Sequence, residues 1–226
     1  MGDSGKDLGD RPNPLTYSPV LPVTTAPPSE FNLHAQILLT FVGLIWVVWL
    51  ADEISRGTLK KNGVRPQSEE GLSGILFAPF LHDDFRHIAA NSISLIALGW
   101  ILLIRDVEDF FLITAVVWLV SGLGTWIFGN SKSNHIGASG IVFGYLGFLI
   151  SQGYFERSVG TIALSVLMLL IYGRMLWLVF PIRDKMSWEM HLFGFLGGVL
   201  AARYLLVLRQ WFETVFFEDG TGNRGD

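Results

Sequence analysis

The sequence contains no cysteine among its 226 residues. Disulfides, thiolate catalysis and cysteine-ligated metal sites are therefore excluded. Charged residues are also scarce, at 16% of the chain, whereas soluble domains usually carry about 25%. The formal net charge of -4 is too small to indicate a nucleic-acid partner. The shortage of charge needs a physical cause, and a membrane environment supplies one.

The chain is instead rich in long apolar runs, and 50% of its residues are hydrophobic. Its charges gather at the two ends and in short connectors, as in a multi-pass membrane protein. Each apolar segment approaches the roughly 20 residues that a helix needs to cross a bilayer, and a backbone in lipid must satisfy its own hydrogen bonds. The sequence predicts an all-α membrane protein, a bundle of six transmembrane helices. The expected spans are 33–51, 87–104, 110–129, 136–152, 159–179 and 189–208.

The remaining segments are predicted to be tails and connectors. Residues 1–32 are rich in Pro, Gly, Ser and Thr without an apolar face, so we expect a disordered tail. This tail has no signal-peptide pattern, and Lys6 stands where a myristoylation signal needs Ser or Thr. Residues 209–226 form a short acidic tail. The longest connector, 52–86, contains GLSGILFAPF, which is too short to cross and is expected to lie in the interface or against the bundle. Lys and Arg are shared evenly between the two sets of connectors, so charge gives no orientation.

Four polar residues inside the expected spans are candidates for function, because polar groups in lipid are costly. They are His87, Asn91, Ser139 and His191, at the starts of spans two, four and six. Alternate spans begin on the same side of the membrane, so all four side chains are expected at one shallow depth that water can reach. The nearby helix N-termini favour a developing negative charge.

Glycines predict which spans approach each other. Gly140 and Gly144 lie four apart in the fourth span, and Gly194 and Gly198 share a helical face with His191 in the sixth. Small residues at this spacing allow close helix contact. If the two faces meet, His191 comes next to Ser139, and a serine becomes a nucleophile when a base lies within hydrogen-bond reach.

Each of these signals also has a simpler interpretation. A serine in a glycine-rich span can be packing, and His87 and Asn91 can bond neighbouring helices. His135 is a rival base, four residues before Ser139, although it is expected in the loop. Glu189 lies two residues from His191 and points elsewhere on the helix, so it is a poor third member of a triad.

Other hydrolytic chemistries fit the sequence less well. The soluble hydrolase pattern G-x-S-x-G fails because Ile141 occupies the final glycine position. No HExxH motif occurs. The stretch HDDFRH at 82–87 offers His and Asp without a further cluster of ligands, so no metal is expected.

Taken together, these residues resemble the rhomboid family of intramembrane serine proteases over about 72–208. The order, spans and spacing of three motifs carry the resemblance. They are H-x-x-x-N at His87 and Asn91, G-x-S-G from Gly137 to Gly140, and H-x-x-G-x-x-x-G at His191, Gly194 and Gly198.

The resemblance implies a Ser-His dyad without a carboxylate and without any cofactor. Ser139 would be the nucleophile and His191 the general base, then the acid. Asn91, His87 and the backbone N–H of Ser139 would hold the oxyanion. His82 matches a histidine that recurs in the family's first connector, with a less defined role.

Some positions depart from the family pattern. Residues 52–86 contain no Trp-Arg pair, and Leu103 stands where better-known bacterial members have glutamate. Phe143 replaces a frequent tyrosine that packs on the histidine, and it can still stack. Met190 replaces a residue that is often small. These differences concern the conformation of the first connector and the choice of substrate.

The resemblance also implies a reaction and a location. A substrate helix would enter laterally between spans two and five and be cleaved after a small side chain. Both termini would lie in the cytoplasm of a bacterium, with the dyad near the outer face of the inner membrane. The alternatives are a non-catalytic rhomboid-like protein that binds client helices, and a six-span transporter, which would want polar groups near the midplane.

Overall fold

A computed structural model describes residues 29–181 and 187–217 of the chain. Residues 1–28 of the predicted disordered tail and 218–226 of the predicted acidic tail lie outside these ranges, whereas residues 30–32 belong to the first helix and 209–217 to the last. The elements are α1 (Glu30–Ile54), η1 (Lys60–Asn62), η2 (Glu69–Gly71), α2 (Gly74–Phe77), η3 (Ala78–Phe80), α3 (Phe85–Arg105), α4 (Val107–Phe128), α5 (Ser139–Glu156), α6 (Val159–Tyr172), η4 (Gly173–Val179) and α7 (Trp188–Phe217). Within the described ranges the only β pairing is one isolated bridge. The all-α prediction is confirmed.

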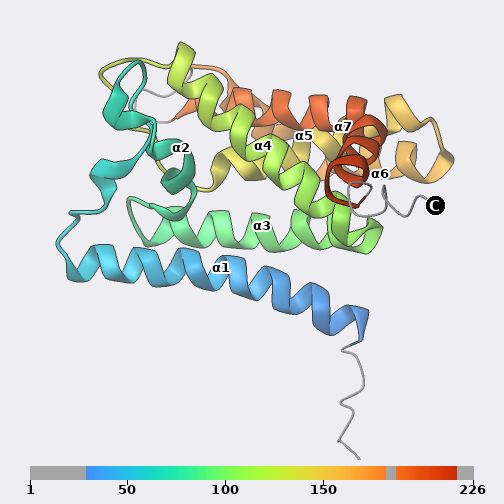
Figure 1. Ribbon diagram of the computed structural model, residues 1–226, viewed down its shortest axis with the longest axis horizontal. Coiled ribbons are helices and arrows are strands. Elements are labelled where there is room, and N and C mark those ends of the chain that lie inside the picture. Colours follow the sequence, from blue (N-terminus) through green and yellow to red (C-terminus); the bar gives the residue numbers. More distant parts are fainter. Residues whose placement is uncertain (1–28, 182–186, 218–226) are drawn as a thin grey trace, which may run out of the picture.

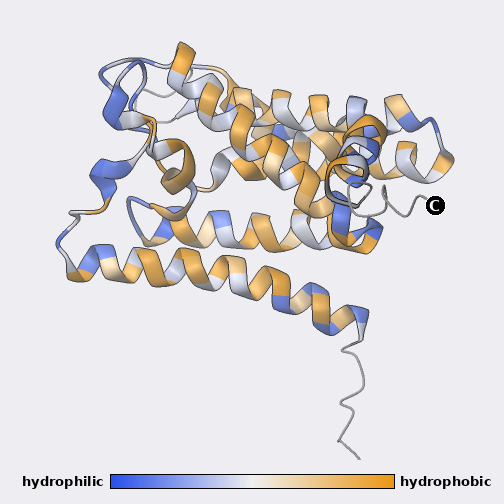
Figure 2. Ribbon diagram, viewed as in Figure 1, coloured by the Kyte–Doolittle hydropathy of each residue, from blue (hydrophilic) through white to orange (hydrophobic). Residues whose placement is uncertain are grey.

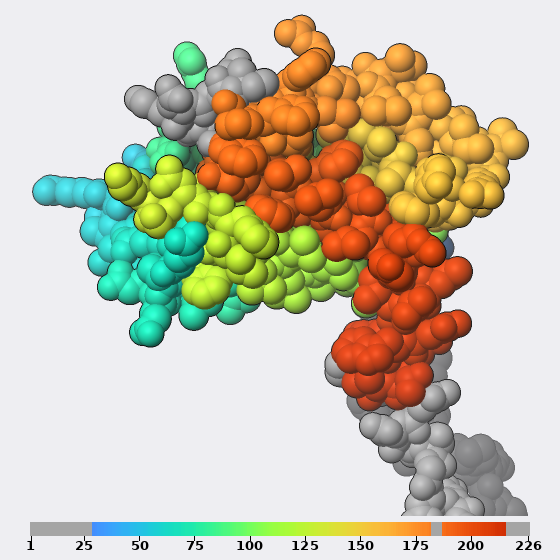
Figure 3. Space-filling model, turned by 90° about the horizontal axis from the view of Figure 1, so that it is seen from above, coloured from blue at the N-terminus to red at the C-terminus, as the bar shows by residue number. Residues whose placement is uncertain are grey.

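The long helices form a bundle around α5. Helices α1 and α3 run side by side along one edge, and α4 crosses the bundle obliquely (Figure 1). Viewed from above, α7 lies across the molecule between α4 and the α6 segment (Figure 3). The most extensive packing joins α7 to α5 and to α4. This packing brings the first turns of α5 and α7 together.

Five helical segments are long and apolar enough to cross a membrane: α1, α3, α4, α6 continued by η4, and α7. Hydrophobic residues run along these helices, whereas hydrophilic ones gather in the connector between α1 and α2 (Figure 2). The sixth expected span, α5, is shorter and rich in Gly and Ser. Every residue from Ser139 to Leu149 is buried, because α3, α4, α6 and α7 all pack against α5. A helix enclosed by protein can be less apolar than one that faces lipid.

Side-chain caps fix where several helices begin. The Asp84 carboxylate accepts the backbone N–H of His87 at 2.9 Å, which starts α3 and places His87 in its first turn. The Asp106 carboxylate accepts the N–H groups of Glu108 and Asp109 and starts α4 directly after α3. An N-cap of this kind typically contributes about 1 kcal/mol. The polar residues that bound the apolar runs therefore define the element ends.

The long connector packs against the bundle. This is one of the two placements that the sequence predicts for it. The Trp118 and Trp126 indoles of α4 donate to the carbonyls of Ile75 and Ser68, at 2.7 Å and 2.9 Å. The Gly137 N–H donates to the Ala78 carbonyl at 2.8 Å. These bonds attach the connector to α4 and to the loop before α5. Tryptophans of α4 thus hold this connector, in which the sequence has no Trp-Arg pair.

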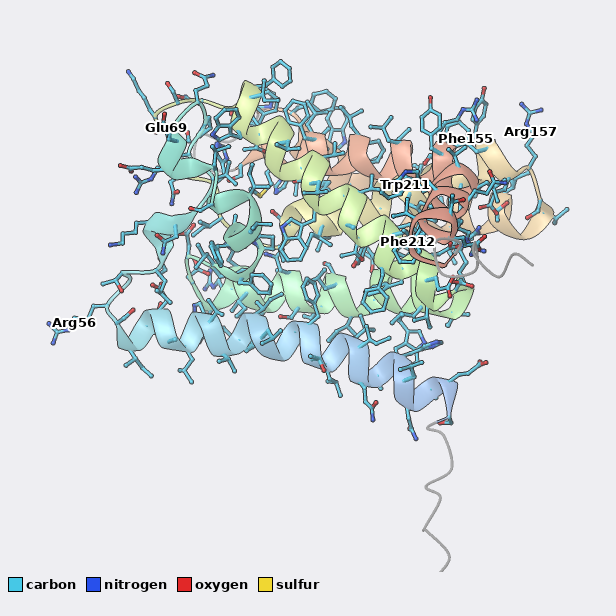
Figure 4. All side chains as sticks on the ribbon, in the orientation of Figure 1. Arg56, Glu69, Phe155, Arg157, Trp211 and Phe212 are labelled. Atoms are coloured by element: carbon cyan, nitrogen blue, oxygen red, sulfur yellow. The ribbon has the colours of Figure 1, made fainter. Side chains whose placement is uncertain are left out.

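Ion pairs join the helices at the other end of the bundle. Arg105 bonds the fully buried carboxylate of Asp109 at 3.1 Å, and Arg209 of α7 contacts the same carboxylate. Figure 4 shows this end, marked by Arg157, opposite Arg56 at the end of α1. This contact lies one residue past 208, where the sixth span was expected to end, and the helix continues to residue 217.

The predicted glycine contact between α5 and α7 exists in a modified form. A Cβ added at Gly194 would overlap the Gly140 carbonyl, and one added at Gly198 would overlap the Gly144 carbonyl. On α5 itself, however, a Cβ at Gly144 would meet Val117 of α4, and one at Gly140 would meet Ser121 of α4 first and then the Met190 side chain. The two glycine faces therefore do not meet directly, because the α7 glycines pack on the α5 backbone while the α5 glycines admit α4.

We expect Gly198→Ala to destabilise the protein. The new methyl group would overlap backbone atoms of α5 that cannot rotate away, and overpacking of this kind costs roughly 1–3 kcal/mol. Gly160→Ala in α6 is the matched control, since a Cβ there meets nothing within 4 Å. Thermal unfolding in detergent measures both. Equal stability of the two variants would show that α7 tolerates displacement from α5.

Candidate active site

A cavity of about 570 Å³ opens where α3, α5 and α7 begin. Its walls contain the four polar residues that the sequence singles out, namely His87, Asn91, Ser139 and His191. Three of these side chains are buried, namely those of Asn91, Ser139 and His191. The fold therefore brings together side chains from three helices at one end of the bundle, as expected from their positions at alternate helix starts.

Ser139 and His191 form a hydrogen bond, although 52 positions separate them in the chain. The distance from the serine Oγ to His191 Nε2 is 2.9 Å. On the other side of the ring, Nδ1 lies 3.0 Å from the Leu178 carbonyl in η4. Because a carbonyl only accepts, the ring proton sits on Nδ1 and Nε2 presents its lone pair to the serine. The Leu178 carbonyl thus fixes the tautomer, as a carboxylate does in a triad.

Packing fixes the plane of the His191 ring. Phe143 of α5, four residues after Ser139, stacks on the imidazole with ring centroids 4.2 Å apart and an interplanar angle of 14°. Stacking was expected here in spite of the change from tyrosine. Phe143 is itself buried, so its ring is a fixed surface against one face of the imidazole.

His87 and Asn91 lie one turn apart on α3 and face the loop before Ser139. Gly137 in that loop has φ +115°, a conformation that other residues rarely adopt. A Cβ at Gly137 would lie 2.7 Å from the His87 ring and 3.4 Å from the Asn91 amide nitrogen. The glycine is required both by its backbone angle and by these neighbours. The first N–H groups of α5, which lack intrahelical partners, emerge at the same place.

The rival residues are placed elsewhere. His135 forms the backbone bridge to Val64, and neither of its ring nitrogens has a hydrogen-bond partner among the described residues. Burial lowers the pKa of His135. Glu189 accepts the N–H of Asn130 at 3.3 Å and does not bond His191. The serine hydroxyl therefore has His191 as its partner, and among residues 29–181 and 187–217 no carboxylate bonds the His191 ring.

The HDDFRH stretch does not assemble a cluster of metal ligands. In the described ranges, no group of three or more His, Asp or Glu side chains is arranged to hold a metal ion. His82 instead points its Nε2 at the Asn91 amide, 2.9 Å away. Asp84 caps α3, and its hydrogen bond to the His87 N–H lowers the pKa of the carboxyl group.

Two groups at the site escape sequence analysis. The Leu178 carbonyl is a backbone atom, which every residue carries, so no pattern could indicate it. Ser121 of α4 donates to the Met190 carbonyl at 3.0 Å, directly behind Gly140 and next to His191. Ser121 lies in the middle of an apolar span, and this polarity is the signal that could have drawn attention to it.

Comparison with known proteins places the chain in context. The model of the Rhomboid domain matches residues 69–208. An uncharacterised protein of Mycobacterium tuberculosis is 38% identical over 204 residues, covering 87% of this chain and 84% of the relative. An uncharacterised protein of Mycobacterium leprae is 40% identical over 192 residues, covering 81% of this chain and 76% of the relative. RHOMBOID-like protein 5 of Arabidopsis thaliana is 30% identical over 162 residues, 68% of this chain and 52% of that protein.

The matched region contains α3 to α6 and the part of α7 up to residue 208, with the cavity between them, and the sequence-based recognition is confirmed. With its several membrane-crossing helices, the protein is an integral multi-pass membrane protein. It belongs to the rhomboid family.

Proposed function

We propose that this protein is an intramembrane serine endopeptidase, which cleaves transmembrane segments of membrane proteins with a Ser139–His191 dyad. The observation that carries the proposal is the 2.9 Å hydrogen bond between the serine Oγ and an imidazole whose tautomer is fixed by the Leu178 carbonyl. A serine held this way has a base ready to take its proton. No metal or organic cofactor takes part in this chemistry.

The tautomer of His191, with its proton on Nδ1, indicates the order of the proton transfers in the proposed reaction. Nε2 of His191 takes the hydroxyl proton while Oγ of Ser139 attacks the substrate carbonyl, giving a tetrahedral intermediate. The same proton then passes from Nε2 to the leaving amine, which departs and leaves an ester on Ser139. Water attacks the ester with His191 again as base, and the proton returns to Oγ when the carboxylic acid leaves. Protons and charges balance over the cycle.

Donors near Ser139 support stabilisation of the oxyanion. The N–H of Ser139 lies at the start of α5, and the side chains of His87 and Asn91 line the same cavity. Such donors act most strongly where water is excluded and where they are already oriented. In our proposal these three groups receive the oxyanion, while Gly137, Gly140, Gly144, Gly194 and Gly198 allow the close packing that keeps them in place.

Loose packing of α6 supports lateral entry of a substrate helix. Only Ser165 and Met168 of this helix are buried, and α6 packs on α5 and η4 with little contact to α3. Its outer face is strongly apolar. A substrate helix is therefore proposed to enter between α3 and α6 and to unwind toward Ser139, with cleavage after a small side chain.

The mycobacterial relatives support a bacterial source. We further propose that the protein resides in the inner membrane, with the dyad near the outer face and both termini in the cytoplasm. The partners are then the lipid bilayer and transmembrane substrates, with no nucleic acid.

A fluorophosphonate probe tests the proposal directly. The purified native chain should be labelled and should cleave a model transmembrane substrate in liposomes, whereas Ser139→Ala should do neither. EDTA should change neither result, because no step uses a metal. A native chain that is folded but is neither labelled nor able to cleave would instead indicate a non-catalytic protein that binds client helices.

A further inference from the structure

His82 is a buried histidine that the proposed reaction does not use. It lies between η3 and α3, and its side chain is only 1% exposed. It is not part of the cavity wall, so it cannot touch a substrate there. Its ring packs edge-on against the His87 ring, with centroids 5.0 Å apart. A buried imidazole of this kind needs a structural or functional reason.

The hydrogen-bond partners of His82 define its tautomer. Nε2 lies 2.9 Å from the Asn91 amide nitrogen and 3.4 Å from the backbone nitrogen of Ala138. A backbone N–H can only donate, so Nε2 must be an acceptor and the ring proton must sit on Nδ1. The Asn91 amide must then turn its NH₂ group, and not its oxygen, toward His82.

This arrangement fixes the remaining N–H of the amide. The Asn91 NH₂ group is planar and has two hydrogens. One is held by His82, so the direction of the other is set by the amide plane. Asn91 lines the catalytic cavity, and its nitrogen lies against Gly137, two residues before Ser139. The second N–H is therefore available at the place where the oxyanion is proposed to form.

We propose that His82 is a positioning residue of the oxyanion hole, which holds one N–H of Asn91 and thereby orients the other toward the substrate carbonyl. The inference rests on the proposed protease function. Through Ala138, the same nitrogen also links the loop before α5 to the start of α3. His82 thus sets the Asn91 donor and the Ser139 backbone relative to each other without touching the substrate.

The environment keeps the His82 ring in the required neutral form. Burial, and then the neighbouring His87, lower the pKa of His82 to about 4, and the Phe80 carbonyl opposes them. The nearby carboxylates of Asp83 and Asp84 are exposed to water. A charged ring would place a third donor against the N–H groups of Asn91 and Ala138. At neutral pH the ring therefore keeps its lone pair.

Two substitutions separate positioning from packing. His82→Leu keeps an apolar side chain of similar size and removes the acceptor, whereas His82→Gln offers a carbonyl oxygen near the position of Nε2. We expect His82→Leu to lower kcat by about 10-fold to 10²-fold with little change in KM, since a misplaced donor can cost that much. His82→Gln should recover most of the loss. If Gln is as poor as Leu, the positioning role is wrong.

The double variant and a matched control complete the kinetic test. Because His82 acts through Asn91, adding His82→Leu to Asn91→Ala should cost no further activity. A further loss equal to that of the single variant would overturn the proposal. His135→Leu is the control, a second buried loop histidine without a hydrogen bond to the site. It should affect stability and leave kcat near normal.

Nitrogen NMR of ¹⁵N-labelled histidine tests the contact independently of catalysis. His82 should show its proton on Nδ1, and Asn91→Ala should shift the Nε2 resonance. A proton on Nε2 would refute the proposal even if His82→Leu fails to fold. If the native chain cleaves nothing, the protease function fails, whereas the NMR result still decides whether His82 holds the Asn91 amide.

Discussion

Replacing either Ser139 or His191 with alanine is expected to abolish cleavage of a transmembrane substrate. Ser139→Ala removes the attacking oxygen. His191→Ala removes the proposed base, whose Nε2 lies 2.9 Å from that oxygen, and a serine alone is a weak nucleophile at neutral pH. Members of a catalytic unit act together, and in one soluble serine protease the loss of either residue lowers kcat by on the order of 10⁶. The measurement is the single-turnover cleavage rate in detergent and in liposomes.

Non-additivity is the sharper part of this prediction. The Ser139→Ala/His191→Ala double variant should be little worse than either single variant, because each already disables the same step. His135→Ala is the matched control. Its ring has no hydrogen-bond partner among the described residues, so it should retain activity. An inactive His135→Ala beside an active His191→Ala would transfer the role of base to His135.

Replacing Asn91 with alanine is expected to lower kcat by about 10²–10³, which corresponds to roughly 2.7–4 kcal/mol of transition-state stabilisation. In the proposed reaction the amide donates to an oxygen that becomes negative only in the transition state, so KM should change little. Asn91→Asp should be at least as damaging, because a carboxylate would repel the oxyanion. Ser139 should remain reactive toward the fluorophosphonate probe, although more slowly.

A neighbour on α3 gives the control for Asn91. Ser92 is also buried and lies away from the cavity. Its hydroxyl accepts the indole N–H of Trp46 in α1, with a donor–acceptor distance of 3.0 Å. Ser92→Ala should therefore cost about 1 kcal/mol of stability and leave kcat near normal. If Asn91→Ala behaves in the same way, with lower thermal stability and unchanged kcat, Asn91 is a structural hydrogen bond and not an oxyanion donor.

Sequence alone determined the membrane class, the family and the positions of the candidate residues along the helices. Apolar segments near the length of a bilayer span gave the helices, because lipid leaves the backbone no other way to satisfy its hydrogen bonds. Placement of His87, Asn91, Ser139 and His191 at alternate helix starts predicted one shared depth. Motif spacing then identified the family, which the Rhomboid domain match confirms.

Tertiary structure decided the contacts that depend on helix rotation. The sequence could place glycines on one face of α7, but not predict that Gly194 and Gly198 would pack on α5 carbonyls while Gly140 and Gly144 admit α4. The periodicity of a helix defines which residues share a face, whereas the direction of that face is set by all its neighbours at once. The enclosure of α5, which makes a weakly apolar segment the centre of the bundle, has the same origin.

Backbone partners were likewise settled only by the fold. The tautomer of His191 depends on the Leu178 carbonyl, and that of His82 depends on the Ala138 N–H. Every residue carries a carbonyl and all but proline an N–H, so neither has a signature in the sequence. The sequence by itself indicated which side chains are candidates for chemistry. Their protonation states and directions came from backbone groups that only the packed helices bring within hydrogen-bond distance.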